Sequence, residues 1–492
     1  MRSLFILLAW SFFHSATAQL PVWFKDEFND NANEWWTGTN EQSSMKIENG
    51  KYVITTFIKD EGRLVRLPVY WEKEKDFSLE ATIVQKSGSD DHGFGLLWGD
   101  NSDGKYHEFT ITTNGYYKIR SPETAKKINE WVAYKKINPM GSENVLRIEQ
   151  RKSKWYFYIN DDQVAAIDPL PLYGSKIGII THTNMVMEVD HFIFKHDVRI
   201  NLPPGLGAGL VKENLGPQVN SAYEDLAPHI TADGRSIIYG VENSPENLGG
   251  VEDGEDIWIT TTDDGKTWSK SSNVGSPLNT TKVNNLAAIS SDNNTLLFCM
   301  NDGFQVRKRT ENGWSEPTYL NVRFTNESSY MEGNLSPDGK AILFACKLKQ
   351  NLYYAGDKDE KDIYVSIQNK DGEWSDPINL GKQINTAETE ISPFLASDGR
   401  TLYFASRGRP GYGGADIYMS KRQGNGWTSW SEPVNLGPEI NGSGFDAYYT
   451  LPASADYAYM VSNTNSYGAA DLVRVKLPEA IKPEPVVLVL GR

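Results

Sequence analysis

The sequence predicts an all-β protein in which a two-sheet β-sandwich is followed by a five-bladed β-propeller. One observation is a repeat in which two short apolar strands flank a turn rich in Ser, Asp and Gly. Such a repeat buries its apolar faces only by stacking on neighbouring copies. The other is that the first 198 residues lack the repeat and instead alternate apolar and polar residues between turn signals. The five copies of the repeat lie at 226–240, 286–300, 332–346, 391–406 and 446–462.

Residues 1–18 have the pattern of a secretory signal peptide. Arg2 supplies a positive charge, an apolar run follows over 4–13, and Ala16-Thr17-Ala18 provides small residues for cleavage. The run is too short to cross a bilayer. We expect an exported mature chain that begins at Gln19 and has no membrane-spanning segment.

Charge and cysteine content narrow the classes of partner. The net charge of −15 argues against nucleic acid or an anionic membrane surface as the main partner. Cys299 and Cys346 end corresponding strands of neighbouring repeats, but strand alternation points them to opposite faces. We expect two buried thiols, and the alternative is a disulfide, which an oxidising compartment permits.

Residues 19–198 are predicted to form the sandwich. Asn114-Gly115 indicates a two-residue hairpin, and Asn160-Asp161 indicates a further turn. Strands separated by turns at this spacing, without an amphipathic helix, are typical of two packed sheets. The predicted strands cover 51–58, 77–85, 93–99, 106–112, 116–120, 145–150, 155–159, 177–182 and 187–194.

This region resembles concanavalin-type jelly rolls in its segments FKDEFNDNANEWW (24–36), GFGLLWGD (93–100), WYFYINDDQV (155–164) and MEVDHFIF (187–194). Some such domains are laminarinase-type glycosidases, which need two carboxylates on one face of a strand. Glu188 and Asp190 have suitable spacing, but Ile193 stands where the further Glu is expected. We therefore expect these acids to be non-catalytic.

The sandwich also contains weaker candidates for binding. Its aromatic residues are expected in the core, and the alternative is a surface for stacking carbohydrate. The loop 100–104 is expected to be an ordinary turn, and the alternative is a calcium site. No other cofactor is expected. The aromatic residues in question are Trp35, Trp36, Trp71, Trp98, Tyr116 and Tyr117.

Residues 199–209 are rich in Pro and Gly and predict a linker, and residues 210–477 are predicted to form the propeller. After its two repeat strands each copy has a third strand, which in four copies begins with Asp. In the first four copies a Trp-Ser pair and a fourth segment follow. The fifth copy stops after its third strand, whereas 210–216 matches the end of a fourth segment. We expect this N-terminal strand to complete the last blade and close the ring. Residues 478–492 are predicted to be a linker and the start of a further domain.

The repeats resemble WD-like repeats of TolB-type propellers, and SRGRPGYGGADIYMS (406–420) is most similar to repeats in bacterial envelope proteins that carry an OmpA-type domain. The resemblance covers about 210–477, and the given sequence contains no OmpA-type domain. It implies a periplasmic or outer-membrane-associated protein whose partners are envelope proteins. Because one fold hosts many functions, it implies no activity.

Strand alternation gives the propeller two distinct ends. The loops that enter each inner strand and those joining second to third strands share one end, the loop face, where the long loops and a column of acids occur. The other end, the turn face, carries tight turns. We expect the loop face to bind a partner; the alternative is that its acids bond backbone amides between blades. The candidate residues are Glu224, Asp225, Glu332, Glu388, Glu390, Asp446, Tyr353, Tyr354, Arg407, Arg409 and Tyr412.

An enzyme is the alternative to a binding protein. Residues 261–268 resemble the Asp box of sialidases, which is a structural turn in that family, and the sialidase Phe-Arg-Ile-Pro motif is absent. His229 is expected to be a packed core histidine rather than a general base. We therefore expect a non-catalytic envelope protein whose propeller docks a protein and whose sandwich is a candidate glycan binder. A sialidase- or glycosidase-type enzyme remains the alternative.

Overall fold

The computed structural model describes residues 20–487 except 32, 34, 58–61, 73, 101–103, 123–129, 183, 207–208, 302, 355–358, 443 and 464–465. The predicted signal peptide and the end of the chain lie outside these ranges. Within them the regular structure is β-strand, apart from the short 3-10 helices η2 (Gly250–Glu252) and η3 (Glu479–Ile481). No helix in the described ranges is long and apolar enough to span a membrane.

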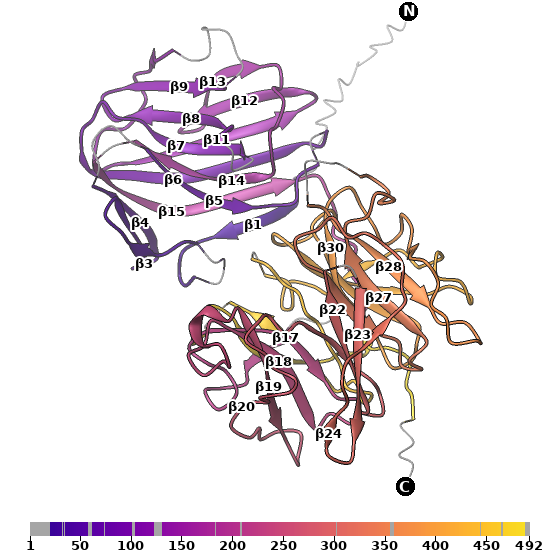
Figure 1. The fold of residues 1–492 in the computed structure, drawn as a ribbon. Coiled ribbons are helices and arrows are strands. Elements are labelled where there is room, and N and C mark those ends of the chain that lie inside the picture. The colour runs from indigo at the N-terminus through magenta and orange to yellow at the C-terminus, as the bar shows by residue number, and fades with distance from the viewer. Residues whose placement is uncertain are drawn as a thin grey trace, which may run out of the picture.

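Strands β1 to β15 form two facing antiparallel sheets, drawn in indigo to magenta in Figure 1. The large sheet has the order β13 (Asp162–Ile167), β12 (Lys154–Ile159), β11 (Glu143–Arg151), β6 (Phe77–Gly88), β15 (Met185–His196), β4 (Lys51–Thr56), β3 (Ser43–Glu48) and β2 (Gly38–Thr39), with β1 (Val22–Asp26) paired to β15. The small sheet has the order β10 (Val132–Ala133), β9 (Tyr116–Arg120), β8 (His107–Thr112), β7 (Phe94–Asp100), β14 (Lys176–Thr181) and β5 (Arg63–Pro68).

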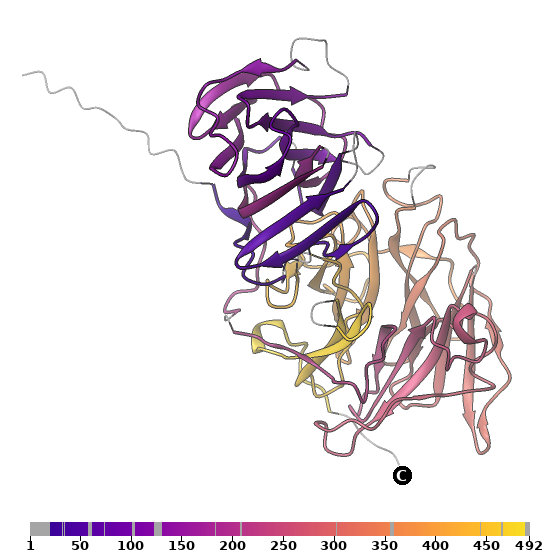
Figure 2. The ribbon, with the colours of Figure 1, turned by 90° about the vertical axis from the view of Figure 1, so that its left-hand side faces the viewer.

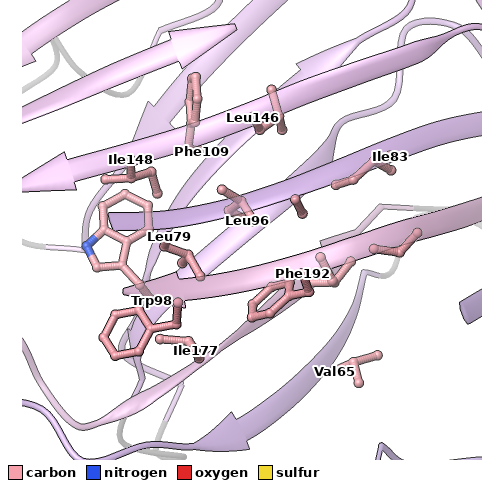
Figure 3. Close-up of a cluster of buried hydrophobic side chains, with 14 of the residues drawn as sticks. Val65, Leu79, Ile83, Leu96, Trp98, Phe109, Leu146, Ile148, Ile177 and Phe192 are labelled. Carbon is pink, nitrogen blue, oxygen red and sulfur yellow. The ribbon is translucent and has the colours of Figure 1, made fainter. Parts of the chain in front are cut away.

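The sandwich core forms where alternate residues of the two sheets meet. Trp98 and Phe109 of the small sheet pack against Leu79 and Ile148 of the large sheet, and all four are fully buried (Figure 3). Period-two alternation places every second side chain in this layer, which is why the sequence pattern predicted the strands.

All nine predicted sandwich strands are present, and the prediction of an all-β fold is confirmed. The turn predicted at Asn160-Asp161 is present, and it is a two-residue hairpin loop, since Ile159 pairs with Asp162. The predicted two-residue hairpin at Asn114-Gly115 is wrong in detail. Thr112 pairs with Tyr116, so the loop has three residues, and Gly115 takes the left-handed conformation with φ 98°. Strands β1, β2, β3, β5, β10 and β13 were not predicted.

The remaining strands form five sheets arranged as the blades of a propeller (Figures 1 and 2). Blade 1 contains β17 (Glu224–Ile230), β18 (Ser236–Glu242), β19 (Glu255–Thr261) and β20 (Ser272–Asn273). Blade 2 contains β21 (Leu286–Ile289), β22 (Thr295–Met300), β23 (Gly303–Thr310), β24 (Gly313–Trp314) and β25 (Thr318–Leu320). Blade 3 contains β26 (Glu332–Leu335), β27 (Ala341–Cys346), β28 (Asp362–Ile367) and β29 (Ile378–Asn379). Blade 4 contains β30 (Glu390–Leu395), β31 (Thr401–Ser406), β32 (Asp416–Lys421) and β33 (Val434–Asn435).

Blade 5 is assembled from both ends of the propeller sequence. Its strands are β34 (Tyr457–Ser462), β35 (Asp471–Lys476) and β16 (Lys212–Asn214), and the bridge from Thr450 to Tyr459 adds the inner segment. Strand β16 pairs antiparallel with β35, so the predicted closing strand is confirmed. Closure leaves no open edge between the first and last blades.

The closing strand makes the same polar contacts as the fourth strands of three other blades. Asn214 Nδ2 donates to Asp471 Oδ2 at 2.6 Å. The matching pairs are Asn273 with Asp256, Asn379 with Asp362 and Asn435 with Asp416, at 2.7, 2.6 and 2.7 Å. Blade 2 differs, because Gly303, which pairs with Met300 at the end of the second strand, occupies the position of the aspartate.

The two cysteines are free and buried, as expected, but the geometric argument against a bridge was incomplete. Cys299 and Cys346 belong to one apolar cluster between blades 2 and 3. They point to opposite faces of their own sheets, and in adjacent blades opposite faces share the same space. Burial raises the pKa of both thiols well above the usual value, and a thiol held protonated is a poor nucleophile.

The Pro- and Gly-rich segment after the sandwich packs along the outer edge of blade 4. Asn201 Nδ2 donates to Pro433 O at 2.8 Å, and Asn435 N donates to Asn201 O at 2.8 Å. Leu206 packs against the apolar cluster shared by blades 4 and 5. The sandwich consequently lies beside these blades, as both ribbon views show (Figures 1 and 2).

Candidate functional site

Three acids of the predicted loop-face column are held inside the fold by backbone amides. Asp225, Glu390 and Asp446 accept the amide of the residue four positions earlier, at 2.7, 2.7 and 2.6 Å. Burial raises the pKa of Asp225 to about 7 and that of Glu390 to about 8. The alternative was that these acids bond backbone amides between blades. They do bond backbone amides, but the amides belong to the segment that leads into the same inner strand.

Other predicted residues of the loop face differ in exposure. Glu224, Glu388, Tyr353, Tyr354 and Arg407 are exposed, and the Tyr354 hydroxyl donates to Glu327 at 2.8 Å. The predicted residues of the loop face therefore include both buried acids and exposed residues at its rim.

Arg409 of blade 4 lies near the sandwich, whereas Tyr412 interacts within the propeller. The guanidinium of Arg409 donates to Ile384 O at 3.2 Å, and its charge lowers the pKa of Tyr70, a residue of the sandwich. Burial outweighs that effect and raises the Tyr70 pKa, while burial and nearby Asp416 raise the pKa of Tyr412 to about 12. Arg409 therefore lies at the junction between the modules, and Tyr412 belongs to the loop that Asp416 fixes.

The remaining candidate, Glu332, opens onto a central cavity of about 340 Å³. Val283 and Tyr330, exposed residues of the loop face, form part of its wall, so the cavity meets that face. A cavity of this size lies at the lower end of the range of ligand pockets, about 300–1,000 Å³. It is lined by Leu226, Ala227, Pro228, His229, Glu242, Glu255, Val283, Asn285, Leu286, Ala287, Tyr330, Glu332, Gly333, Asn334, Ser392, Pro393, Phe394, Tyr448, Tyr449 and Thr450.

The backbone is strained at three points of the cavity wall. Ala227, Ser392 and Tyr448 adopt left-handed φ values of 46°, 51° and 60°, although none is glycine. They occupy corresponding positions in blades 1, 4 and 5, six residues before the turn positions Asp233, Asp398 and Ser454. Such residues cost about 1–3 kcal/mol each and are concentrated at functional sites.

His229 lies on an inner strand, as expected. Its Nε2 is 2.9 Å from Leu286 O, and burial lowers its pKa to about 4. A neutral imidazole bonded to the neighbouring blade packs the wall of the cavity and carries no charge near neutral pH.

A row of three glutamates crosses blade 1 at the cavity mouth. In the sheet register Glu242 pairs with Glu224 on one side and with Glu255 on the other, so the three side chains share one face. Like charges placed directly opposite repel one another. Burial, followed by the charge of Glu224, raises the pKa of Glu242; burial, followed by Glu242, raises that of Glu255 to about 8. This row was not predicted from the sequence. The predicted acidic column covers only residues near the start of the inner strands, whereas Glu242 and Glu255 lie on the second and third strands of blade 1.

The sandwich has a polar patch on the outer surface of its small sheet that the sequence did not reveal. Glu108 is fully buried there between Lys118 and Arg120, at 3.4 and 3.0 Å. Trp131, 40% exposed, lies under Lys118, whose Nζ is 4.6 Å from its ring centroid, and against Gly93. The patch therefore combines an exposed ring with charged hydrogen-bonding groups.

Most of the aromatic residues considered for a carbohydrate-stacking surface lie in the core, as expected. Trp35, Trp71, Trp98 and Tyr117 are buried in the sandwich core. This agrees with the expectation that these rings form the core. The exposed rings of that set, Trp36 and Tyr116, lie on different sheets.

The other chemical candidates occupy structural positions. Glu188 and Asp190 form ion pairs with Lys86 and Lys51 on the outer surface of the large sheet. In the Asp-box-like turn, Asp264 accepts the amides of Lys266 and Thr267, both at 2.8 Å.

The sequence offered one candidate metal site, the calcium-binding alternative for the loop 100–104. Most of the candidate calcium loop, 101–103, lies outside the described residues. In the described part of the chain, no three His, Cys, Asp or Glu side chains are grouped so as to hold a metal ion.

Comparison with known proteins gives weak structural likenesses. No family model and no curated protein matches the sequence. TolB from Acinetobacter baumannii is 11% identical over 67% of this chain and 78% of its own, with a TM-score of 0.34. The carbohydrate recognition domain of Emp46p is 14% identical over 37% of this chain and 100% of its own, with a TM-score of 0.28. A laminarinase from Flavobacterium sp. UMI-01 is 14% identical over 35% of this chain and 99% of its own, with a TM-score of 0.27. At these scores the likenesses assign neither a family nor a function to the chain.

Proposed function

We propose that this chain is an exported, non-catalytic binding protein of the cell envelope, and that its propeller docks a protein partner on the loop face. The observation that carries the proposal is the position of the exposed apolar side chains of the propeller. The set in question is the large apolar residues of 210–477 that the structure describes as exposed. Apart from Val211 and Tyr319, all of them lie on loop-face segments. These residues are Tyr223, Leu248, Val251, Val283, Tyr330, Leu352, Tyr353, Tyr354 and Tyr467.

This distribution favours protein docking. Loop-face segments of blades 1, 2, 3 and 5 contribute to it, and they surround the mouth of the central cavity. Apolar side chains gathered on one face of a soluble protein mark interaction sites, whereas single exposed ones need no explanation. Recognition by loops on a rigid β scaffold is common.

Exchanging apolar loop-face residues for polar ones tests the docking proposal. We expect the double variant Tyr353→Ser with Val283→Ser to capture its main envelope partner at least tenfold less than the wild type, because exposed apolar area drives docking. The full-length protein is immobilised, exposed to an envelope extract of its own organism, and the bound proteins are quantified by mass spectrometry. The matched control is Tyr319→Ser with Val211→Ser, at residues 69% and 68% exposed away from the loop face. Equal loss in both double variants would contradict the proposal.

For the sandwich, the patch around Trp131 favours glycan binding. An exposed aromatic ring stacks on the apolar face of a sugar ring, and the ionised groups beside it offer donors and acceptors for hydroxyl groups. The buried Glu108 is fixed by its ion pairs, so the polar part of the patch is already ordered before a ligand arrives.

A glycan array tests this part of the proposal. We expect Trp131→Ala to lose most of the glycan signal of the wild type, and Trp36→Ala, which removes a similarly exposed ring elsewhere, to retain it. The same glycans are assayed for hydrolysis. Turnover of a glycoside that a single carboxylate substitution abolishes would contradict the non-catalytic proposal and favour the glycosidase alternative.

A further inference from the structure

The central cavity contains a carboxyl group that no described cation neutralises. Glu255 is 8% exposed and lies on the wall of the cavity. Its backbone oxygen accepts from Asn284, but its carboxyl group has no hydrogen bond or ion pair to any residue that the structure describes. The charges that act on it belong to Glu242, Asp256 and Glu332, and all of them are negative. A buried carboxyl group that faces only like charges retains its proton, and it ionises readily only when a cationic guest enters.

Two further polar atoms of the cavity wall have no hydrogen bond of ordinary geometry. Glu332 is 9% exposed, and its Oε2 accepts the amide and hydroxyl of Ser392 at 2.6 and 2.7 Å. Its Oε1 is buried without such a bond, although the Tyr448 hydroxyl and the Lys361 ammonium both act on this carboxylate. The hydroxyl of Tyr449 is likewise buried without a partner. Native proteins pair the great majority of such buried atoms, so these two indicate a missing group.

The aromatic side chains that line the cavity also favour binding of a cation. Tyr330, Tyr448 and Tyr449 line the cavity beside the glutamates. The protein already places one ammonium on this wall, since Lys361 Nζ lies 3.9 Å from the Tyr330 ring centroid. Its charge is matched by Asp359, 3.3 Å away. Aromatic side chains that line a cavity can contribute cation–π contacts to a guest cation.

We propose that the central cavity binds the basic side chain, a lysine ammonium or an arginine guanidinium, of a partner polypeptide that lies across the loop face. The proposal rests on the proposed docking function and identifies the group that enters the ring. A polypeptide is favoured over a free amine because the acidic cavity opens directly onto the apolar loop face, so one chain contacts both. Glu255 and Glu332 pair with the cation, and the tyrosine rings surround its alkyl stem.

Binding of the cation is coupled to proton release. Burial raises the pKa of Glu255 to about 8, so near neutral pH the empty cavity retains a proton there. The titratable groups that face Glu255 are Glu242, Asp256, Glu332 and Tyr448. A guest ammonium favours the ionised carboxylate, so a proton leaves as the guest enters and affinity increases with pH towards about 8.

Calorimetric titration of the full-length protein tests the proposal. The probe is acetyl-Ala-Lys-Ala-amide, and its uncharged analogue carries norleucine in place of lysine. We expect the lysine peptide to bind at least tenfold more tightly than the norleucine peptide and than cadaverine, with a heat that depends on the ionisation enthalpy of the buffer. Glu255→Gln and Glu332→Gln are expected to weaken it at least tenfold, whereas Glu373→Gln, at an exposed position on the turn face, leaves it unchanged.

Each result supports or overturns the proposal. No binding, equal binding of the lysine and norleucine peptides, or unchanged affinity in both cavity variants would overturn it. Cadaverine binding as tightly as the peptide would overturn the polypeptide guest. Circular dichroism of each variant establishes that it is folded, and either cavity variant suffices if the other does not fold. If Glu255→Gln still captures the envelope partner, the docking function stands and only the cation site fails.

Discussion

Replacing Asn220 with alanine is expected to lower the free energy of unfolding of the propeller by about 3–5 kcal/mol, because several buried polar groups lose their partners at once. Asn220 Nδ2 donates to Asn214 Oδ1 at 2.8 Å and to Leu472 O at 3.0 Å, and its Oδ1 accepts the Leu472 amide at 2.9 Å. This one side chain therefore holds the closing strand β16 against β35. Urea denaturation monitored by tryptophan fluorescence measures the change.

Asn441 provides a matched control in another blade. It makes the same contacts with Ile417 and Asn435, at 2.8, 3.0 and 2.9 Å, but joins segments that are near in sequence. Asn441→Ala is expected to destabilise blade 4 locally. Only Asn220→Ala releases strands more than 250 residues apart, and their rejoining must again overcome loop-closure entropy. Hydrogen exchange is therefore expected to increase in β16 and β35 of Asn220→Ala alone, and the same pattern in Asn441→Ala would contradict this account of closure.

The stability of the propeller is expected to fall as the pH rises from about 5 to about 9. Burial raises the pKa of Asp225 and Asp416 to about 7, and of Glu255 and Glu390 to about 8. Unfolded Asp and Glu titrate near pH 4. Between these values the folded state holds protons that the unfolded chain has released, so the free energy of unfolding decreases with pH through about 8.

Glu255→Gln isolates one of these groups. Since each unit of pKa shift corresponds to about 1.4 kcal/mol, we expect the variant to be about 2–4 kcal/mol more stable than the wild type at pH 9 and nearly equal to it at pH 5. Guanidinium denaturation at both pH values measures this difference. Glu373→Gln, at an exposed position, is the control and is expected to change neither value by more than about 0.5 kcal/mol. A difference for Glu255→Gln that does not vary with pH would refute the expectation.

Local sequence patterns accounted for most of the fold. The repeat predicted five blades, and the incomplete fifth copy predicted the closing strand that β16 supplies. The unpredicted strands include β13, whose residues are only partly buried and lack a regular alternation. A strand at the edge of a sheet is defined by its neighbour more than by its own pattern. The Cys299 and Cys346 faces were assigned correctly within each blade, but the space between blades depends on how neighbouring sheets stack.

The candidate site was only partly accessible to sequence reasoning. The loop face was expected from strand direction, and exposed Tyr353 and Tyr354 lie there. The acids Asp225, Glu390 and Asp446 could not be told from binding residues, because their partners are backbone amides. The sequence carries no mark for such partners.

The sequence by itself determined the all-β class, the number of blades and the way the ring closes, because strand period and repeat length are properties of neighbouring residues. Only the tertiary structure decided which carboxylates face the axis. Glu224, Glu242 and Glu255 come from three successive strands, and Glu332 joins them from another blade. Their proximity depends on strand register and on the rotation between blades, and no local pattern of residues records either of these.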